Sequence, residues 1–107
     1  MELQYRIEKE SLFVPMPQEV DHHVAKSISR EIDFLIDSWH VRQVVFDFTN
    51  TEFMDSSGIG MLIGRSRKMG YAGGSVQAEN LNDRVQKIFT LAGLPRLIPV
   101  VKEEQDD

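Results

Sequence analysis

Apolar and polar positions alternate at the start of the chain, where Leu3, Tyr5 and Ile7 are separated by polar residues. A period of two is typical of a half-buried strand. The polar break at 8–11 is followed by a second apolar run at 12–14, so the two runs are predicted to pair as a β-hairpin.

Pro15 and Pro17 follow the second strand and cannot donate ladder hydrogen bonds. Residues two apart in a strand point their amides to the same side. Both missing donors should therefore face one neighbouring strand, and pairing on the other side should survive.

Three later stretches have helical spacing. The first follows Asp21, a good N-cap, the second spans about 58–69, and the third spans about 82–92. Their apolar stripes are Val24, Ile28, Ile32, Leu35 and Trp39, then Ile59, Leu62, Ile63 and Met69, then Leu81, Val85, Ile88, Phe89 and Ala92. After the third helix, Gly93 is expected as a left-handed C-cap, followed by an apolar contact from Leu94.

Short apolar runs lie between and after these helices, at 43–48, near 75–77 and at 97–101. The order β-β-α-β-α-β-α-β predicts an α/β fold, with helices packed on a mixed, mostly parallel sheet of four or five strands. At 107 residues the chain is one domain, predicted over 1–101, followed by an acidic tail at 102–107.

Composition and charge argue against several classes of function. The net charge is -5, of which the tail carries -3, so the body has no basic footprint for nucleic acid. The chain has no cysteine, and no apolar run approaches the ~20 residues of a membrane span. We expect a cytoplasmic protein with no cofactor, no metal and neither nucleic acid nor membrane as a partner.

The segment E-F-M-D-S-S-G-I-G at 52–60 is the strongest candidate site, because it lies between a predicted strand and a helix. Ser56 and Ser57 fall near the helix start, where unpaired amides stabilise an anion. One of Asp55, Ser56 and Ser57 could simply cap the helix. A cap leaves the second serine unexplained, and it does not explain Gly58, which suggests that something approaches the backbone there.

Three other chemistries are weaker. A serine nucleophile with His22 or His23 as base lacks the small flanking residues of a nucleophile elbow. Asp21-His22-His23 could bind a metal, but a cap with one packed and one exposed histidine is simpler. Asp47 could accept a phosphoryl group as in receiver domains, but residues 8–11 look like a hairpin turn instead of the acidic loop that such a site needs.

Taken together, V-D-H-H at 20–23, F-M-D-S-S-G-I-G at 53–60, Ile63-Gly64-Arg65 and L-A-G-L at 91–94 resemble the anti-sigma factor antagonists. These are single STAS domains, and the likeness is greatest to the sporulation antagonists of the anti-sigma F factor. It covers residues 3–101.

The resemblance implies a switch and no enzyme activity. In the family, the unphosphorylated antagonist binds an anti-sigma factor that is also a serine kinase, and so frees the sigma factor. The kinase phosphorylates the first serine of the motif, here Ser56, and a PP2C-type phosphatase restores it. The implied partner-binding residues are Asp21, His22, Asp55, Ser56, Ser57, Gly58 and Ile59. The alternative is a STAS scaffold without a phospho-switch.

This chain departs from the family pattern in two places. Pro15-Met16-Pro17-Gln18 stands where the family usually has a glycine, beside the implied partner surface. We also expect this chain to lack the family's terminal helix, because an acidic tail follows soon after the last predicted strand. The resemblance to the family assigns no role to Trp39, at the end of the first predicted helix.

Overall fold

The computed structural model describes residues 3–101 and contains one five-stranded sheet, one two-stranded sheet, three α-helices and a 3-10 turn. The strands are β1 (Arg6–Glu8), β2 (Ser11–Pro15), β3 (Glu19–Val20), β4 (Gln43–Asp47), β5 (Phe53–Met54), β6 (Ser75–Glu79) and β7 (Val100–Val101). The helices are α1 (His22–Trp39), α2 (Ser56–Tyr71) and α3 (Asp83–Leu91), and the 3-10 turn η1 is Leu94–Arg96.

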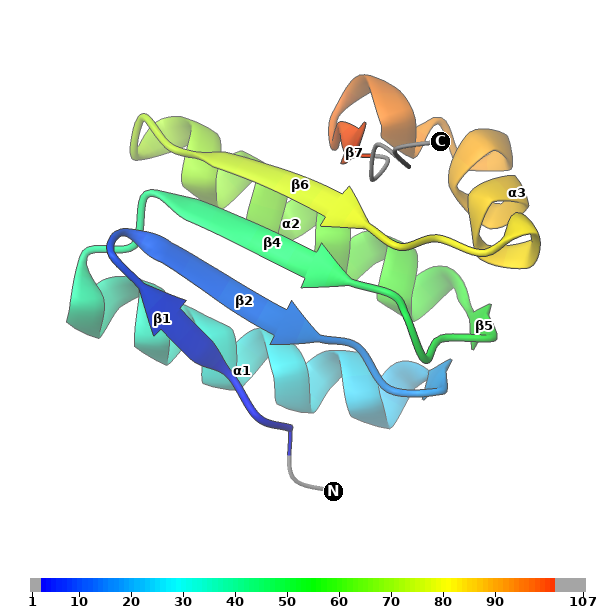
Figure 1. Cartoon of the computed structure of the whole chain (residues 1–107), viewed down its shortest axis with the longest axis horizontal. Helices are drawn as coiled ribbons and strands as arrows, with labels where there is room; N and C mark the ends of the chain where they lie inside the picture. Colours follow the sequence, from blue (N-terminus) through cyan, green and yellow to red (C-terminus); the bar gives the residue numbers. More distant parts are fainter. Residues whose placement is uncertain (1–2, 102–107) are drawn as a thin grey trace, which may run out of the picture.

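The main sheet has the order β1-β2-β4-β6-β7. β1 and β2 form an antiparallel hairpin, and the other neighbours are parallel. α1 and α2 lie side by side against one face of this sheet, while α3 lies beyond the carboxyl end of β6 (Figure 1). The predicted α/β fold, the N-terminal hairpin and the mostly parallel sheet are confirmed.

The core lies between the sheet and the two long helices. Its largest fully buried side chains include Leu12, Phe46, Phe48, Ile28 and Leu62. β4 is buried along its centre, as expected for the middle strand of a parallel sheet.

The proline prediction is confirmed, because β2 keeps its pairing with β4 as far as Pro15 opposite Asp47. The amide of Met16 donates to Asp47 O at 2.8 Å, so the two proline nitrogens face away from β4. The predicted strand over 3–7 is wrong at its start, since β1 begins at Arg6. The register pairs Arg6 with Phe13. Residue 4 would therefore face Pro15, which has no N–H to donate.

The end of the chain and the helical stripes also differ from prediction. The last strand is only Val100–Val101, because η1 continues through bonds from the amides of Leu97 and Ile98 to Leu94 O. Gly93 has the predicted left-handed conformation, with φ 72°, and Leu94 is buried. The α1 stripe is rotated: Trp39 is 62% exposed, and the fully packed residues are Ala25, Ile28, Ile32 and Ile36. The predicted tail at 102–107 lies outside the described residues.

Candidate functional site at the paired helix N-termini

Two strand-to-helix junctions lie side by side at the carboxyl end of the sheet. β3 pairs in parallel with β5, with Val20 opposite Met54, and each strand leads directly into a helix. The amide of Asp55 donates to Val20 O at 3.1 Å, which fixes the second junction against the first. The predicted motifs at 20–23 and 53–60 are thereby brought together.

Each helix begins with an aspartate N-cap. Asp21 Oδ1 accepts from the amide of Val24 at 2.9 Å in α1. Asp55 Oδ1 accepts from the amides of Ser57, at 2.8 Å, and Gly58, at 3.2 Å, in α2. The cap of α2 is therefore Asp55 and neither serine, and this carboxylate uses two of the amides that the helix start would offer to an anion.

Ser56 is the first residue of α2 and is exposed. Within residues 3–101, no hydrogen bond forms to its hydroxyl. Ser57 is half-buried, and its Oγ lies 3.4 Å from His22 Nδ1 across the junction. The two serines therefore differ: Ser56 points to solvent, and Ser57 belongs to the contact between the helices.

Gly58 is buried, and what comes close to it is the domain's own core. A Cβ at this position would lie 2.4 Å from Met54 Cγ and 2.9 Å from Val20 Cγ1. Something does approach the backbone at Gly58, as expected, but it is the side chains of Val20 in β3 and Met54 in β5. Ile59, half-buried, packs against the core from the next position of the helix.

The loop before β5 is held by residues that the sequence reasoning missed. Thr51 is fully buried, and its hydroxyl donates to Pro17 O at 2.8 Å. Asn82, the N-cap of α3, donates to Thr51 O at 2.9 Å. These bonds tie the segments before β3 and β5 to each other and to α3. No pattern in the sequence indicates that Thr51 lies next to Pro17, because the two residues are 34 positions apart.

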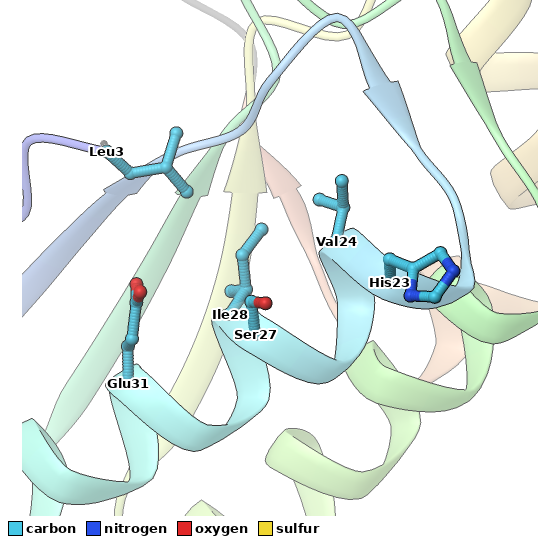
Figure 2. A pocket seen from close by; sticks show the side chains of 6 residues that line it. All are labelled: Leu3, His23, Val24, Ser27, Ile28 and Glu31. Atoms are coloured by element: carbon cyan, nitrogen blue, oxygen red, sulfur yellow. The ribbon is translucent and has the colours of Figure 1, made fainter. Parts of the chain in front are cut away.

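The two histidines line different hollows on either side of the α1 start. His22 lines a groove of about 300 Å³ between α1 and α2, formed by His22, Ala25, Lys26, Ser29, Ser57 and Met61. His23 lines a second hollow of about 210 Å³ between α1 and the N-terminal segment, together with Leu3 and Glu31 (Figure 2). Both histidines are exposed, so the prediction that one of them packs is wrong.

Asp47, considered above as a phosphoryl acceptor, is the last residue of β4 and is hydrogen-bonded to the loops that follow β4 and β6. Its Oδ1 accepts from the Thr49 amide at 3.0 Å, the Thr49 hydroxyl at 2.6 Å and Asn80 Nδ2 at 3.0 Å. Burial alone would raise the pKa of Asp47, but these hydrogen bonds outweigh it and lower the pKa. The carboxylate therefore holds the loops after β4 and β6 together.

In the described part of the chain, no three histidine, aspartate or glutamate side chains are grouped as a metal site requires. None of the helices in residues 3–101 is both long and apolar enough to cross a membrane.

Comparison with known proteins decides the family. The model of the STAS domain family matches residues 2–106. The chain belongs to the STAS domain family. Among curated proteins, this STAS domain is 29% identical over 93 residues to the anti-sigma F factor antagonist of Paenibacillus polymyxa, covering 87% of this chain and 80% of that protein.

Two solved structures of SpoIIAA, one described as an anti-sigma factor antagonist and the other as a Bacillus cell fate determinant, are also similar to this STAS domain. The unphosphorylated form has 26% identity and a TM-score of 0.85, covering 97% of this chain and 90% of that one. The phosphorylated form has 26% identity and a TM-score of 0.77, covering 97% and 93%. The resemblance drawn from the sequence motifs is confirmed.

Proposed function

We propose that this STAS domain is an anti-sigma factor antagonist whose binding is switched off by phosphorylation of Ser56. In this proposal the unphosphorylated form binds an anti-sigma factor with serine kinase activity and releases the sigma factor. A PP2C-type phosphatase reverses the modification. The observation that carries the proposal is the exposed Ser56 hydroxyl, presented at the start of α2 between two capped helix N-termini.

The binding surface in this proposal is the paired junction itself. Asp21 and His22 are exposed on the α1 side, and Ser56 is exposed on the α2 side. Asp55, Ser57 and Ile59 are half-buried behind them, so they contribute partly through the shape of the surface. Gly58 is buried, and its contribution is to allow α2 to begin close to Val20 and Met54.

A phosphoryl group at Ser56 adds a charge of about -1.5 to -2 at neutral pH. The amides of Ser57 and Gly58, which could have received it, already donate to Asp55 Oδ1. The new charge therefore remains at the surface beside a carboxylate. A partner that covers it must desolvate it, at a cost of several kcal/mol. A loss of ~4 kcal/mol weakens binding about a thousandfold.

The test uses the cognate anti-sigma kinase with ATP, followed by intact-mass measurement and fragmentation. We expect one phosphoryl group on wild type, located at Ser56, none on Ser56→Ala, and one on the matched control Ser57→Ala. Calorimetric titration with the kinase without ATP should show Ser56→Ala binding like wild type. Ser56→Asp should bind at least ~10-fold more weakly, since aspartate carries only part of the phosphate charge.

Modification at Ser57, or equal binding by all variants, would refute the switch. Binding without any phosphoryl transfer would instead identify a STAS scaffold that holds its partner constitutively.

A further inference from the structure

β1 is one of the two edge strands of the main sheet, and it lies at the opposite end of the molecule from the proposed switch. β1 is the first strand of the sheet order, so no strand within residues 3–101 pairs with its outer side. An unprotected edge strand presents free N–H and C=O groups to other chains. The hydrogen bonds of β2 determine which N–H and C=O groups of β1 point away from the sheet.

β2 bonds to β4 through its even-numbered residues. The Met16 amide donates to Asp47 O at 2.8 Å, and the Gln43 amide donates to Glu10 O at 3.2 Å, just before β2. Leu12 has the same parity, so its backbone polar groups also face β4. Leu12 is the β1 partner of Ile7, and the two therefore form a pair without mutual hydrogen bonds. The N–H and C=O of Ile7 consequently point out of the open edge.

Below this edge lies an apolar groove of about 360 Å³, lined by Tyr5, Ile7, Leu35 and Trp39. Trp39, the only tryptophan in the sequence, is 62% exposed although its side chain is large and mostly apolar. The other face of β1 carries Arg6 and Glu8, both more than half exposed, whose side chains lie 3.2 Å apart. An open backbone edge, an apolar groove and two opposite charges thus occupy three sides of one strand.

We propose that β1 pairs antiparallel with β1 of a second copy of this chain, in the register that places Ile7 opposite Ile7. In that register the outward groups of the two Ile7 residues form two reciprocal hydrogen bonds. Arg6 of each copy faces Glu8 of the other in a pair without backbone bonds, where side chains are closest. The register shifted by two residues would place Arg6 against Arg6, and like charges directly opposite are unfavourable. The two apolar grooves then face each other on the helix side of the joined sheet.

The proposed β1 contact and the proposed switch lie in different parts of the molecule. Ile7 pairs near the start of β2, whereas Ser56 follows β5 beyond the carboxyl ends of the parallel strands. β1 lies at one edge of the sheet and the β5–α2 junction lies at the far end of the strands (Figure 1). A dimer formed through β1 would therefore leave both Ser56 residues outside the contact.

Sedimentation equilibrium over a wide concentration range, with Trp39 fluorescence recorded alongside, tests the proposal. We expect a monomer–dimer equilibrium with a blue shift of Trp39 emission as the dimer forms. Arg6→Glu and Glu8→Arg should each weaken the dimer about tenfold, because two pairs change from attraction to repulsion. The double variant Arg6→Glu/Glu8→Arg should restore wild-type affinity.

Two controls separate this contact from general effects. Arg67→Glu changes an exposed charge on α2 by the same amount and should leave the dimer unchanged. Phe34→Ser removes an apolar side chain that is 68% exposed on α1 outside the groove, and should also have no effect, whereas Trp39→Ser should weaken the dimer. A monomer at all concentrations, or a dimer that is indifferent to the two single charge reversals, would overturn the proposal.

Discussion

Replacing Gly58 by alanine tests whether the start of α2 is fixed by its contact with β3 and β5. The added Cβ would lie 2.4 Å from Met54 Cγ and 2.9 Å from Val20 Cγ1. Met54 Cγ is close to its own backbone, so it cannot swing away as the end of a long side chain could. Overpacking of this kind costs about 1–3 kcal/mol.

Alanine also favours a helix over glycine by about 1 kcal/mol, which opposes the packing cost. The net expectation for Gly58→Ala is a loss of up to about 2 kcal/mol in the free energy of unfolding. Gly60→Ala is the matched control in the same helix, because a Cβ there meets nothing within 4 Å. It should gain about 0.5–1 kcal/mol.

Urea unfolding followed by circular dichroism measures both variants. Their unfolding free energies should differ by roughly 2 kcal/mol, which corresponds to roughly 8 °C or more in Tm for a domain of this size. Combining Gly58→Ala with Met54→Ala should cost less than the sum of the two single changes, since the clash is removed. If Gly58→Ala stabilised the domain as much as Gly60→Ala does, the contact of position 58 with Met54 and Val20 would not limit the start of α2.

Three further predictions concern the cap, the buried threonine and the N-terminal tyrosine. Asp55→Ala should lower the free energy of unfolding by about 1–2 kcal/mol, because the amides of Ser57 and Gly58 lose their acceptor. Asp55→Asn keeps an accepting oxygen and should cost much less. Equal losses for the two variants in urea unfolding would contradict the role of Asp55 as the cap. Thr51→Val should cost about 1–3 kcal/mol in the same assay, because Pro17 O loses its donor in a buried site; an unchanged midpoint would show that the bond contributes nothing. Burial and the hydrogen bond to Glu31 raise the pKa of the Tyr5 phenol, so the folded state favours the protonated form. The resulting stabilisation is present below about pH 10, where the phenol is protonated in the unfolded chain as well, and it is lost as the pH rises further. Wild type should therefore lose stability above about pH 10 more steeply than Tyr5→Phe, and parallel stability curves for the two proteins would count against this assignment.

The fold was predictable from the sequence where a pattern is local. Asp21 was placed correctly as an N-cap, and Gly93 was correctly expected to be left-handed, because a single residue type favours each feature. The C-cap of α3 is Ala92, one residue before the predicted position. The pairing of β2 with β4 as far as Pro15 was also predictable, because the side to which each amide points alternates along any strand. Trp39 was misplaced because apolar character at helical spacing does not say which edge of a wide stripe faces the core.

The candidate site was predictable as two motifs but not as one surface. What joins the motifs is the two-residue pairing of β3 with β5, which is too short to leave a strand pattern. The local signal was the repeat of an apolar residue followed by a capping aspartate, as Val20-Asp21 and Met54-Asp55. Two such junctions predict two helix starts, but their parallel pairing depends on Thr51 and Pro17, which are distant in the sequence.

The geometry of the second junction divides two tasks between adjacent residues. Asp55 satisfies the helix amides, while the Ser56 hydroxyl supports nothing in the described part of the fold. A helix whose own serine acted as the cap would lose that cap on modification, so a phosphoryl group would change stability and binding together. With the cap supplied by Asp55, a charge added at Ser56 acts on whatever docks there and leaves the core beneath it unchanged. A switch in this position can therefore operate by surface electrostatics alone, and Ser56→Ala and Ser56→Asp should unfold at nearly the same urea concentration as wild type even if their affinities for a partner differ widely.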